Sequence, residues 1–291
     1  MKAYPNLFIA GLIVSSRIFS QDIAVTHEVK IYKSVDGNEL KADIFYTAET
    51  MKNQQNAAMA FFHGGGWAYG SPSEFYTTCE RYARKGFITF SFQYRLSITE
   101  DGTVPNPDVT LVECVKDARS ALRWVRENAT AFHIDPGRII AAGQSAGGQL
   151  AIGCALFDNI NEESDDPDIS PVPNALVLFS SNLNTMEAWA DWLMGERRKE
   201  IWSVSPYHNL RPGMPPAIEF HGTEDCMVPI YILNLFKEKT LAMGNHFESV
   251  VFEEQGHYYG DADGIYGKYY NEPVLERTDE FLKEFGFIQQ P

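Results

Sequence analysis

The chain has 291 residues, of which 44% are hydrophobic and 22% are charged, so it can form a globular protein with a substantial core. Its 39 acidic and 24 basic side chains give a formal net charge of −15 at pH 7. A surface this acidic repels a phosphate backbone. We therefore expect no nucleic-acid partner.

The first twenty residues have the pattern of a secretory signal peptide. Lys2 precedes an apolar run over 7–14, and the small Ser20 stands at a candidate cleavage point before Gln21. The run is shorter than the roughly 20 apolar residues that span a bilayer, so we expect no stable membrane anchor. The sequence thus predicts a signal peptide over 1–20, a secreted or periplasmic protein, and a single domain over 21–291.

The patterning along the chain predicts alternating strands and helices. Two strands come first, at 25–32 and 40–46, and the second places alternate apolar residues on one face. The continuous apolar run at 57–62 then predicts a strand buried on both faces, and further strands are expected at 87–92, 138–142, 175–179, 217–220 and 247–252. Apolar residues at helical spacing, with caps, predict helices at 73–85, 111–128, 145–156, 231–243 and 273–285. This alternation indicates the α/β class, a mostly parallel sheet with helices on both faces.

Four cysteines are few for a chain of this length, and their spacing fits neither a disulfide scaffold nor a metal site. We expect buried free thiols, with a disulfide in an oxidising compartment as the alternative, at Cys79, Cys114, Cys154 and Cys226. The sequence has no CxxC or HExxH pattern, and we expect no metal or other cofactor. An acidic run over 162–168 is interpreted as a solvated loop, with calcium binding as the alternative.

A candidate nucleophile, Ser145, lies at the turn from a strand to a helix. The turn reads Gly143-Gln144-Ser145-Ala146-Gly147, which is the GxSxG pattern of a nucleophile elbow. Glycines are needed there because the tight turn brings strand and helix close together and leaves no room for side chains. The sequence therefore predicts a serine hydroxyl that projects clear of the sheet.

A glycine run follows the strand at 57–62 and can supply an oxyanion hole. It reads His63-Gly64-Gly65-Gly66-Trp67, and backbone N–H groups fixed in such a loop can stabilise a tetrahedral intermediate. We expect the donors to be the N–H groups of Gly65, Gly66 and Ala146. His63 is interpreted as a hydrogen-bonding support for the loop.

The acid and the base are expected in loops that follow later strands. Asp225 comes after the strand at 217–220, and we prefer it to its neighbour Glu224 as the carboxylate that orients the base. His257 lies between Gly256 and Gly260 in the loop after the strand at 247–252 and is the expected base. His246 is interpreted as an ordinary surface residue.

These motifs resemble the α/β-hydrolase superfamily, and within it the serine esterases with an HGGGW loop and a GxSAGG elbow. The resemblance covers most of residues 25–286. It implies a triad in the order Ser145, Asp225 and His257, which forms an acyl-enzyme that water then hydrolyses. The N-terminal cap helices of hormone-sensitive-lipase-like members are missing, so the chain looks closer to compact secreted acetyl and feruloyl esterases that act on polysaccharides.

The longest insertion between the expected strands, over 180–216, bears on the substrate. Three tryptophans among polar residues suit a modest wall better than a lipid-binding lid, so we expect short, acetyl-type acyl groups on a small-molecule or glycan ester. The expected sugar-binding aromatic side chains, with packing against the sheet as the alternative, are Trp67, Tyr69, Trp189 and Trp192.

Two other functions fit the same motifs. One is an exopeptidase resembling the prolyl oligopeptidases, which usually carry HGGP in place of HGGGW and a propeller domain that this chain is too short to include. The other is a non-catalytic binding protein on the same fold, although such proteins typically lose the serine or the histidine. The sequence makes no prediction of oligomeric state.

Overall fold

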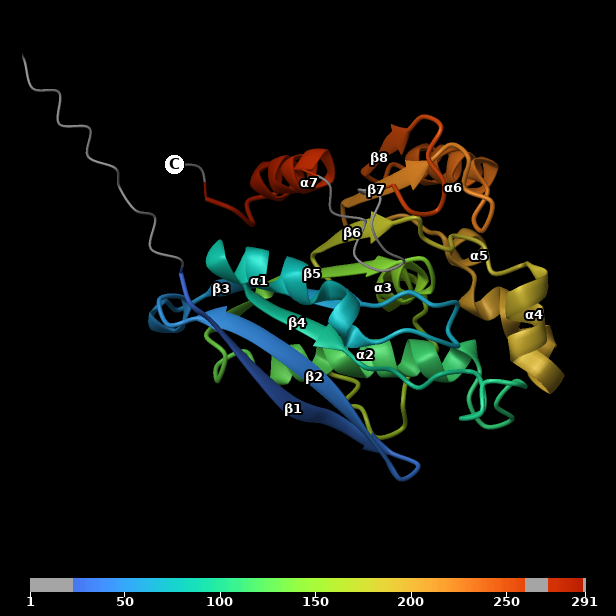
Figure 1. Ribbon diagram of the computed structural model, residues 1–291, viewed down its shortest axis with the longest axis horizontal. Coiled ribbons are helices and arrows are strands. Elements are labelled where there is room, and N and C mark those ends of the chain that lie inside the picture. Colours follow the sequence, from blue (N-terminus) through green and yellow to red (C-terminus); the bar gives the residue numbers. More distant parts are fainter. Residues whose placement is uncertain (1–22, 260–271, 290–291) are drawn as a thin grey trace, which may run out of the picture.

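The computed structural model describes residues 23–259 and 272–289 and is built on one eight-stranded sheet (Figure 1). The strand order is β1-β2-β4-β3-β5-β6-β7-β8, with β1 and β2 antiparallel to their neighbours and β3 to β8 parallel. The expected signal peptide lies outside the described residues. The strands are β1 (Val25–Val35), β2 (Asn38–Thr47), β3 (Asn56–Phe62), β4 (Ile88–Phe92), β5 (Ile134–Gln144), β6 (Ala175–Phe179), β7 (Ala217–Gly222) and β8 (Phe247–Phe252).

Helices connect the parallel strands and cover both faces of the sheet, which confirms the predicted fold class (Figure 1). The α-helices are α1 (Tyr76–Arg84), α2 (Leu111–Glu127), α3 (Ala146–Leu156), α4 (Ala188–Met194), α5 (Pro206–Asn209), α6 (Ile230–Ala242) and α7 (Glu272–Glu284). Short 3₁₀ turns are η1 (Thr50–Lys52), η2 (Pro72–Phe75) and η3 (Gly195–Val204).

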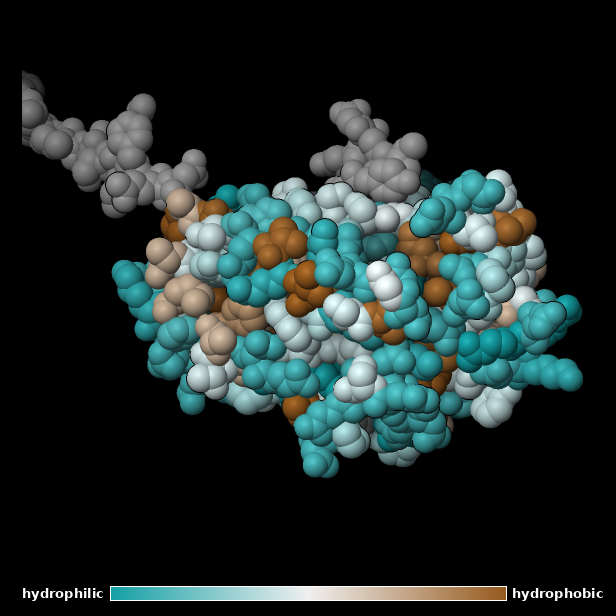
Figure 2. Space-filling view, turned by 90° about the horizontal axis from the view of Figure 1, so that it is seen from below, coloured by the Kyte–Doolittle hydropathy of each residue, from teal (hydrophilic) through white to brown (hydrophobic). Residues whose placement is uncertain are grey.

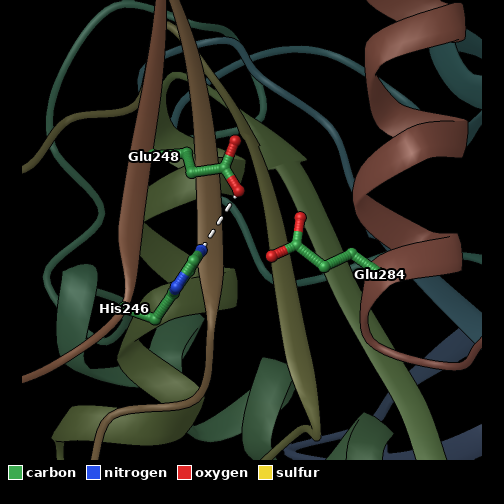
Figure 3. Close-up of side chains that lie close together, drawn as sticks. All are labelled: His246, Glu248 and Glu284. Atoms are coloured by element: carbon green, nitrogen blue, oxygen red, sulfur yellow. Dashed lines mark hydrogen bonds and ion pairs between the residues drawn. The ribbon is translucent and has the colours of Figure 1, made fainter.

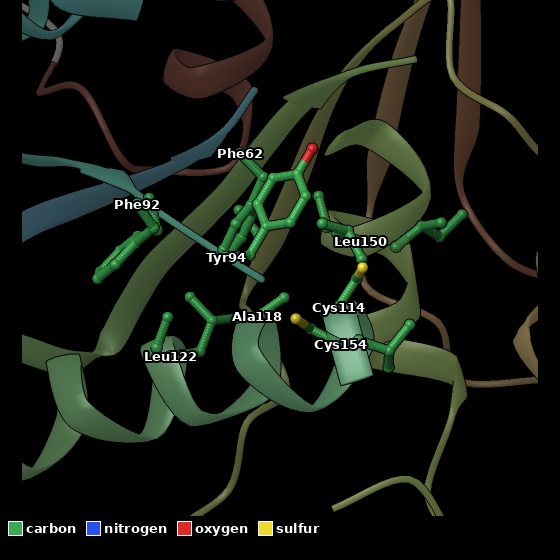
Figure 4. Close-up of a cluster of buried hydrophobic side chains, with 14 of the residues drawn as sticks. Phe62, Phe92, Tyr94, Cys114, Ala118, Leu122, Leu150 and Cys154 are labelled. Carbon is green, nitrogen blue, oxygen red and sulfur yellow. The ribbon is translucent and has the colours of Figure 1, made fainter. Parts of the chain in front are cut away.

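The core lies in two layers, one on each face of the sheet. One layer packs strand residues against α2 and α3, as where Phe62 and Phe92 meet Ala118 and Leu150 (Figure 4). The other packs the opposite strand face against α1 and α7, with Phe61 and Phe281 in one cluster. The central strands are therefore buried on both sides, which is why they read as continuous apolar runs.

The predicted elements match the observed ones, with differences at their ends. The helix expected at 73–85 begins one residue earlier as the 3₁₀ turn η2, with Pro72 and the Ser71–Glu74 capping box at its start, and becomes α-helical at Tyr76. The strand expected at 138–142 extends over all of β5. The strand expected at 40–46 has a second buried face, since Asp43 and Phe45 are covered on the α1 side.

The interpretation of the run over 162–168 as a solvated loop is wrong for two of its residues. Glu162 accepts hydrogen bonds from Lys33, at 2.9 Å, and Arg95, at 3.0 Å, which also bind the buried Asp117. Asp165 pairs with Arg123 at 2.9 Å. These basic side chains come from other parts of the chain, so their pairing with the run could not be seen in its local composition.

Three of the expected free thiols are buried, at Cys79, Cys114 and Cys154, whereas Cys226 is exposed, contrary to the prediction. No helix within 23–259 and 272–289 is both long enough and apolar enough to cross a membrane. The face seen in Figure 2 is mostly hydrophilic, with small separate hydrophobic patches.

Candidate active site

Ser145 lies at a strained turn between β5 and α3. Its φ is +53°, a left-handed value that residues other than glycine rarely adopt. The turn is held because Ser145 N–H donates to Phe179 O at 2.9 Å. A Cβ on Gly143 would lie 2.2 Å from Gly147 O, and a Cβ on Gly147 would lie 2.0 Å from Phe62 O. Only glycine fits at either position, so the sequence pattern has a direct steric cause.

Asp225 and His257 meet beside this turn. They come from the loops that follow β7 and β8, and His257 Nδ1 donates to Asp225 Oδ2 at 2.7 Å. The other oxygen of Asp225 accepts the backbone N–H groups of Met227 and Val228. Burial raises the pKa of Asp225, but the hydrogen bond and charge of His257 outweigh it and hold that pKa below its usual value. Glu224 is exposed.

The remaining ring nitrogen of His257 is occupied by a residue that sequence reasoning did not single out. The amide Nε2 of Gln144 donates to His257 Nε2 at 3.0 Å, and both side chains are buried. Among the described contacts, Ser145 Oγ has no hydrogen bond to His257. His257 Nε2 could therefore accept a proton only after the Gln144 amide releases it.

Hydrogen bonds hold the first two carbonyls of the glycine loop. Gly64 O accepts from His63 Nδ1 at 2.8 Å, and Gly65 O accepts from the N–H of Tyr69 at 2.9 Å. In a planar trans peptide the N–H points opposite to the C=O, so the N–H groups of Gly65 and Gly66 face away from these contacts. Neither N–H has an acceptor within the described residues, and both glycines line the cavity at Ser145.

His63 supports the loop in the way that the sequence suggests. Its ring stacks on Tyr94 at 4.3 Å between centroids, and the Tyr94 hydroxyl donates to His63 O at 2.9 Å. Burial lowers the pKa of His63 to about 4, so the ring is neutral at pH 7. His63 is therefore an uncharged structural element of the loop.

Trp67 does not offer its ring to a substrate. Its side chain is 1% exposed, and its indole N–H donates to Gln149 Oε1 on α3 at 2.9 Å. The expectation that Trp67 binds a sugar ring is therefore wrong, because the last residue of the HGGGW motif fastens the glycine loop to the elbow helix. Gln149 in turn donates to Val204 O in η3 at 2.7 Å.

A cavity of about 500 Å³ opens at Ser145 and His257. Tyr69 and Trp189 line it and are 48% and 37% exposed, and their rings stack with centroids 6.5 Å apart. Trp192 continues this strip, with its ring centroid 5.0 Å from that of Trp189. We call Tyr69, Trp189 and Trp192 the aromatic strip. Two carboxylates, Glu74 and Glu187, also line the cavity.

A second histidine lies behind Asp225. His221 on β7 is fully buried, its Nε2 donates to Val228 O at 2.8 Å, and its Nδ1 is 3.4 Å from Glu219 Oε1. Burial lowers the pKa of His221, but the hydrogen bond and charge of Glu219, with a smaller contribution from Asp225, outweigh it and raise that pKa. This pair supports the loop of the acid, a role that no local motif indicates.

One group of side chains in the described part of the chain has the spacing of metal ligands: His246, Glu248 and Glu284 (Figure 3). His246 is exposed, as expected, and bonds Glu248 at 3.1 Å. Arg277 also pairs with Glu248, so a cation would have to compete with a guanidinium. The group begins at the amino end of β8, opposite the edge at which Ser145, Asp225 and His257 lie.

A mostly parallel sheet with a serine at a strand-to-helix turn, and an acid–histidine pair in the loops after later strands, defines an α/β-hydrolase. The BD-FAE family model matches residues 42–240. Since that match covers more than half of the chain, this protein belongs to the BD-FAE family of α/β-hydrolase serine esterases.

Solved structures similar to this chain are esterases. The propionate-bound esterase Est2 of Thermogutta terrifontis is 38% identical, with a TM-score of 0.80 over 91% of this chain and 96% of that one. A structure of the same esterase phosphorylated by paraoxon is 37% identical, with the same TM-score and coverage.

Curated relatives of this chain are named as an esterase and a lipase. Esterase LipC of Mycobacterium tuberculosis is 25% identical over 66% of this chain, and Lipase 2 of Moraxella sp. is 29% identical over 45%. The chain spans half of the first relative and 29% of the second. The solved structures and these relatives are named as ester hydrolases, the class to which the family match assigns this chain.

Proposed function

We propose that this esterase hydrolyses short-chain, acetyl-type esters carried on carbohydrates, through an acyl-enzyme on Ser145. The observation that carries the proposal is the buried Asp225–His257 hydrogen bond beside a strained elbow serine, at a cavity that the glycine loop also lines. Nucleophile, base and orienting acid then have the roles of a serine-hydrolase triad.

In the proposed mechanism, Asp225 keeps the proton of His257 on Nδ1, which leaves Nε2 free of a proton. Gln144 releases Nε2 as substrate enters, and Nε2 then takes the proton of Ser145 Oγ as Oγ attacks the acyl carbon. The N–H groups of Gly65, Gly66 and Ala146 stabilise the oxyanion, and His257 returns its proton to the leaving alcohol. Water then attacks the acyl-enzyme, with His257 again as the base, and the carboxylic acid is released from Ser145.

The preference for short acyl groups is supported by the size of the cavity. About 500 Å³ must hold both the acyl group and the part of the alcohol next to it, and Glu74 and Glu187 take up part of the wall. Burial raises the pKa of Glu74, and its carboxyl is a polar group that a long alkyl chain would have to desolvate. The propionate in a structurally similar esterase supports the same preference.

The carbohydrate alcohol is supported by the aromatic strip. Tyr69, Trp189 and Trp192 form an exposed row of rings at the mouth of the cavity, a surface on which a sugar ring can stack. Tyr69 also lines a second hollow of about 620 Å³, whose wall includes Asn38 and Glu39. Amide and carboxylate groups of this kind can bind sugar hydroxyls.

The test compares aryl esters of increasing acyl length and then acetylated xylan fragments. We expect kcat/KM to fall from acetate through butyrate to octanoate, and acetate to be released from the fragments. A higher rate on octanoate would contradict the acyl preference. If no acid were released from any acetylated or feruloylated glycan tried, the proposed carbohydrate substrate would be contradicted.

Export remains part of the proposal, since a polysaccharide is met outside the cytoplasm. The run over 7–14 and Ser20 support cleavage before Gln21. The intact mass of native protein from the medium or periplasm should fit a chain that begins near Gln21, and a retained Met1 would contradict this.

A further inference from the structure

We propose that Trp189 holds the oxyanion loop in its catalytic geometry, so that the insertion over 180–216 belongs to the catalytic machinery as well as to the wall of the cavity. This rests on the proposed assignment of Gly65 and Gly66 as oxyanion donors. The indole Nε1–H of Trp189 donates to Gly66 O at 2.9 Å, between residues 123 positions apart.

A run of three glycines needs such a contact. Glycine is the residue with the most backbone freedom, and Gly65 and Gly66 have φ of +103° and +60°. Gly64 O and Gly65 O are held by His63 and by the turn at Tyr69. Among the described contacts, the partner of Gly66 O is Trp189, which fixes the peptide plane after Gly66 and limits rotation at its Cα.

The indole also packs against the loop. A Cβ on Gly66 would lie 2.7 Å from Trp189 Nε1, so the ring covers the space beside the Gly66 Cα. A side chain at position 66 would displace the indole and break its hydrogen bond at once. The bare glycine and the tryptophan therefore fit each other as a pair.

Trp189 is itself well supported. Glu187 caps the start of α4 and accepts the N–H groups of Trp189, at 2.9 Å, and Ala190, at 3.1 Å. Ala190 and Leu193 of α4 are buried and anchor the helix to the core. The indole is thus presented from an anchored element, which is what a group that positions a catalytic loop requires.

Loss of the indole N–H should weaken transition-state binding and leave ground-state binding intact, because the oxyanion forms only as Ser145 attacks. Trp189→Phe keeps an aromatic ring and removes the donor. If Trp189 served only as a stacking surface, this variant would keep the wild-type kcat and would change KM at most. The matched control is Trp202→Phe, which changes an exposed tryptophan of the same insertion.

The experiment measures kcat and KM on an aryl acetate, together with Ki for an alkyl trifluoromethyl ketone. Ser145 Oγ adds to the ketone carbonyl carbon, His257 takes the hydroxyl proton, and the carbonyl oxygen becomes an oxyanion at the proposed donors. For Trp189→Phe we expect kcat to fall about tenfold with KM unchanged, less than the loss for a deleted oxyanion donor. Ki should rise by the same factor.

A wild-type kcat in Trp189→Phe would overturn the inference, as would a change in KM alone, which would indicate a stacking role. An equal loss in Trp202→Phe would also overturn it, since the effect would then belong to the insertion in general. The melting temperature of each variant separates these outcomes from misfolding. If the wild type itself hydrolysed no ester, the proposed function would fail instead.

Discussion

The nucleophile elbow and the glycine loop meet at Ser145 but are held in different ways. The elbow motif lies within five residues, in which Gly143 packs against Gly147, and its backbone also contacts Phe62 O and Phe179 O. The loop is fixed from a distance, through Trp67 to Gln149, 82 positions away, and through Gly66 to Trp189, 123 positions away. We infer that the nucleophile elbow is specified by a short motif and held by backbone contacts, whereas the oxyanion loop is held by side chains from distant parts of the chain.

The largest expected loss in kcat comes from a change at Asp225. This residue lies outside both the elbow and the glycine loop, so its loss is a reference for the changes in either. Asp225→Asn should lower kcat by on the order of 10⁴-fold, because an amide no longer selects the His257 tautomer with its proton on Nδ1. Glu224→Gln is the matched control, since Glu224 is the exposed neighbour, and it should stay near the wild type. Equal losses in kcat for the two variants would contradict the assignment.

A smaller loss in kcat is expected when a side chain is added in the elbow at Gly147. Gly147→Ala would place a Cβ 2.0 Å from Phe62 O and 2.4 Å from His63 O, so α3 must shift and carry Ser145 with it. Displacement of a nucleophile by about 1 Å can cost on the order of 10²-fold in kcat.

The control for the elbow is Gly137→Ala, whose Cβ would meet only the Asp135 side chain at 3.2 Å. Kinetics on an aryl acetate, with melting temperatures, compare the two variants. If Gly147→Ala kept the kcat of Gly137→Ala, the elbow would not be under the steric constraint described here.

The long-range support of the loop is tested at Gln149. Gln149→Met keeps the volume but leaves Trp67 Nε1–H and Val204 O without their partner, which should lower the free energy of unfolding by about 1–3 kcal/mol. Turnover should fall by about tenfold, less than for Gly147→Ala, because the loop loosens while the nucleophile stays in place.

Leu150→Met is the matched control for Gln149, since it changes the next buried residue of α3 without removing a hydrogen bond. Urea unfolding and aryl acetate kinetics check both variants. Equal stability and turnover in the two would show that Gln149 does not hold the loop.

The smallest expected effect is on stability against pH, at the Glu219–His221 pair. The pKa of His221 is raised above its ordinary value of 6.5 in the folded protein, so folding favours the charged ring. That contribution is complete below about pH 6.5 and is lost as pH rises through the raised pKa. Glu219→Gln removes the charge that raises the pKa and should flatten this slope. A slope equal to that of the wild type in urea unfolding would contradict the pairing.

The sheet and the triad candidates could be predicted because their signals are local. Strands buried on both faces read as apolar runs, and the elbow and the loops of Asp225 and His257 follow strands within a few residues. The roles of the side chains that position these groups could not be predicted. Gln144 and Gln149 bind His257 and Trp67, which lie 113 and 82 positions away in the chain. Glu219 lies only two residues from His221, but the position of this pair behind Asp225 follows from the fold alone.

The environments of Trp67 and of the acidic run over 162–168 were predicted wrongly for the same reason. An aromatic residue beside a glycine loop suggested substrate contact, and an acidic run suggested solvent. In the folded chain, Trp67 is buried and donates to the distant Gln149. Lys33, Arg95 and Arg123 pair with part of the acidic run. Composition predicts exposure only where no complementary group arrives from elsewhere.

The central claim is that Ser145 is the nucleophile of an ester hydrolase, and labelling with paraoxon tests it most directly. The wild type should lose its esterase activity in step with uptake of one diethylphosphoryl group, which peptide mass spectrometry should locate on Ser145. Ser145→Ala should fold normally, take up no label and have almost no turnover. A stoichiometric label on another residue, or an active Ser145→Ala enzyme free of contaminating esterase, would contradict the account.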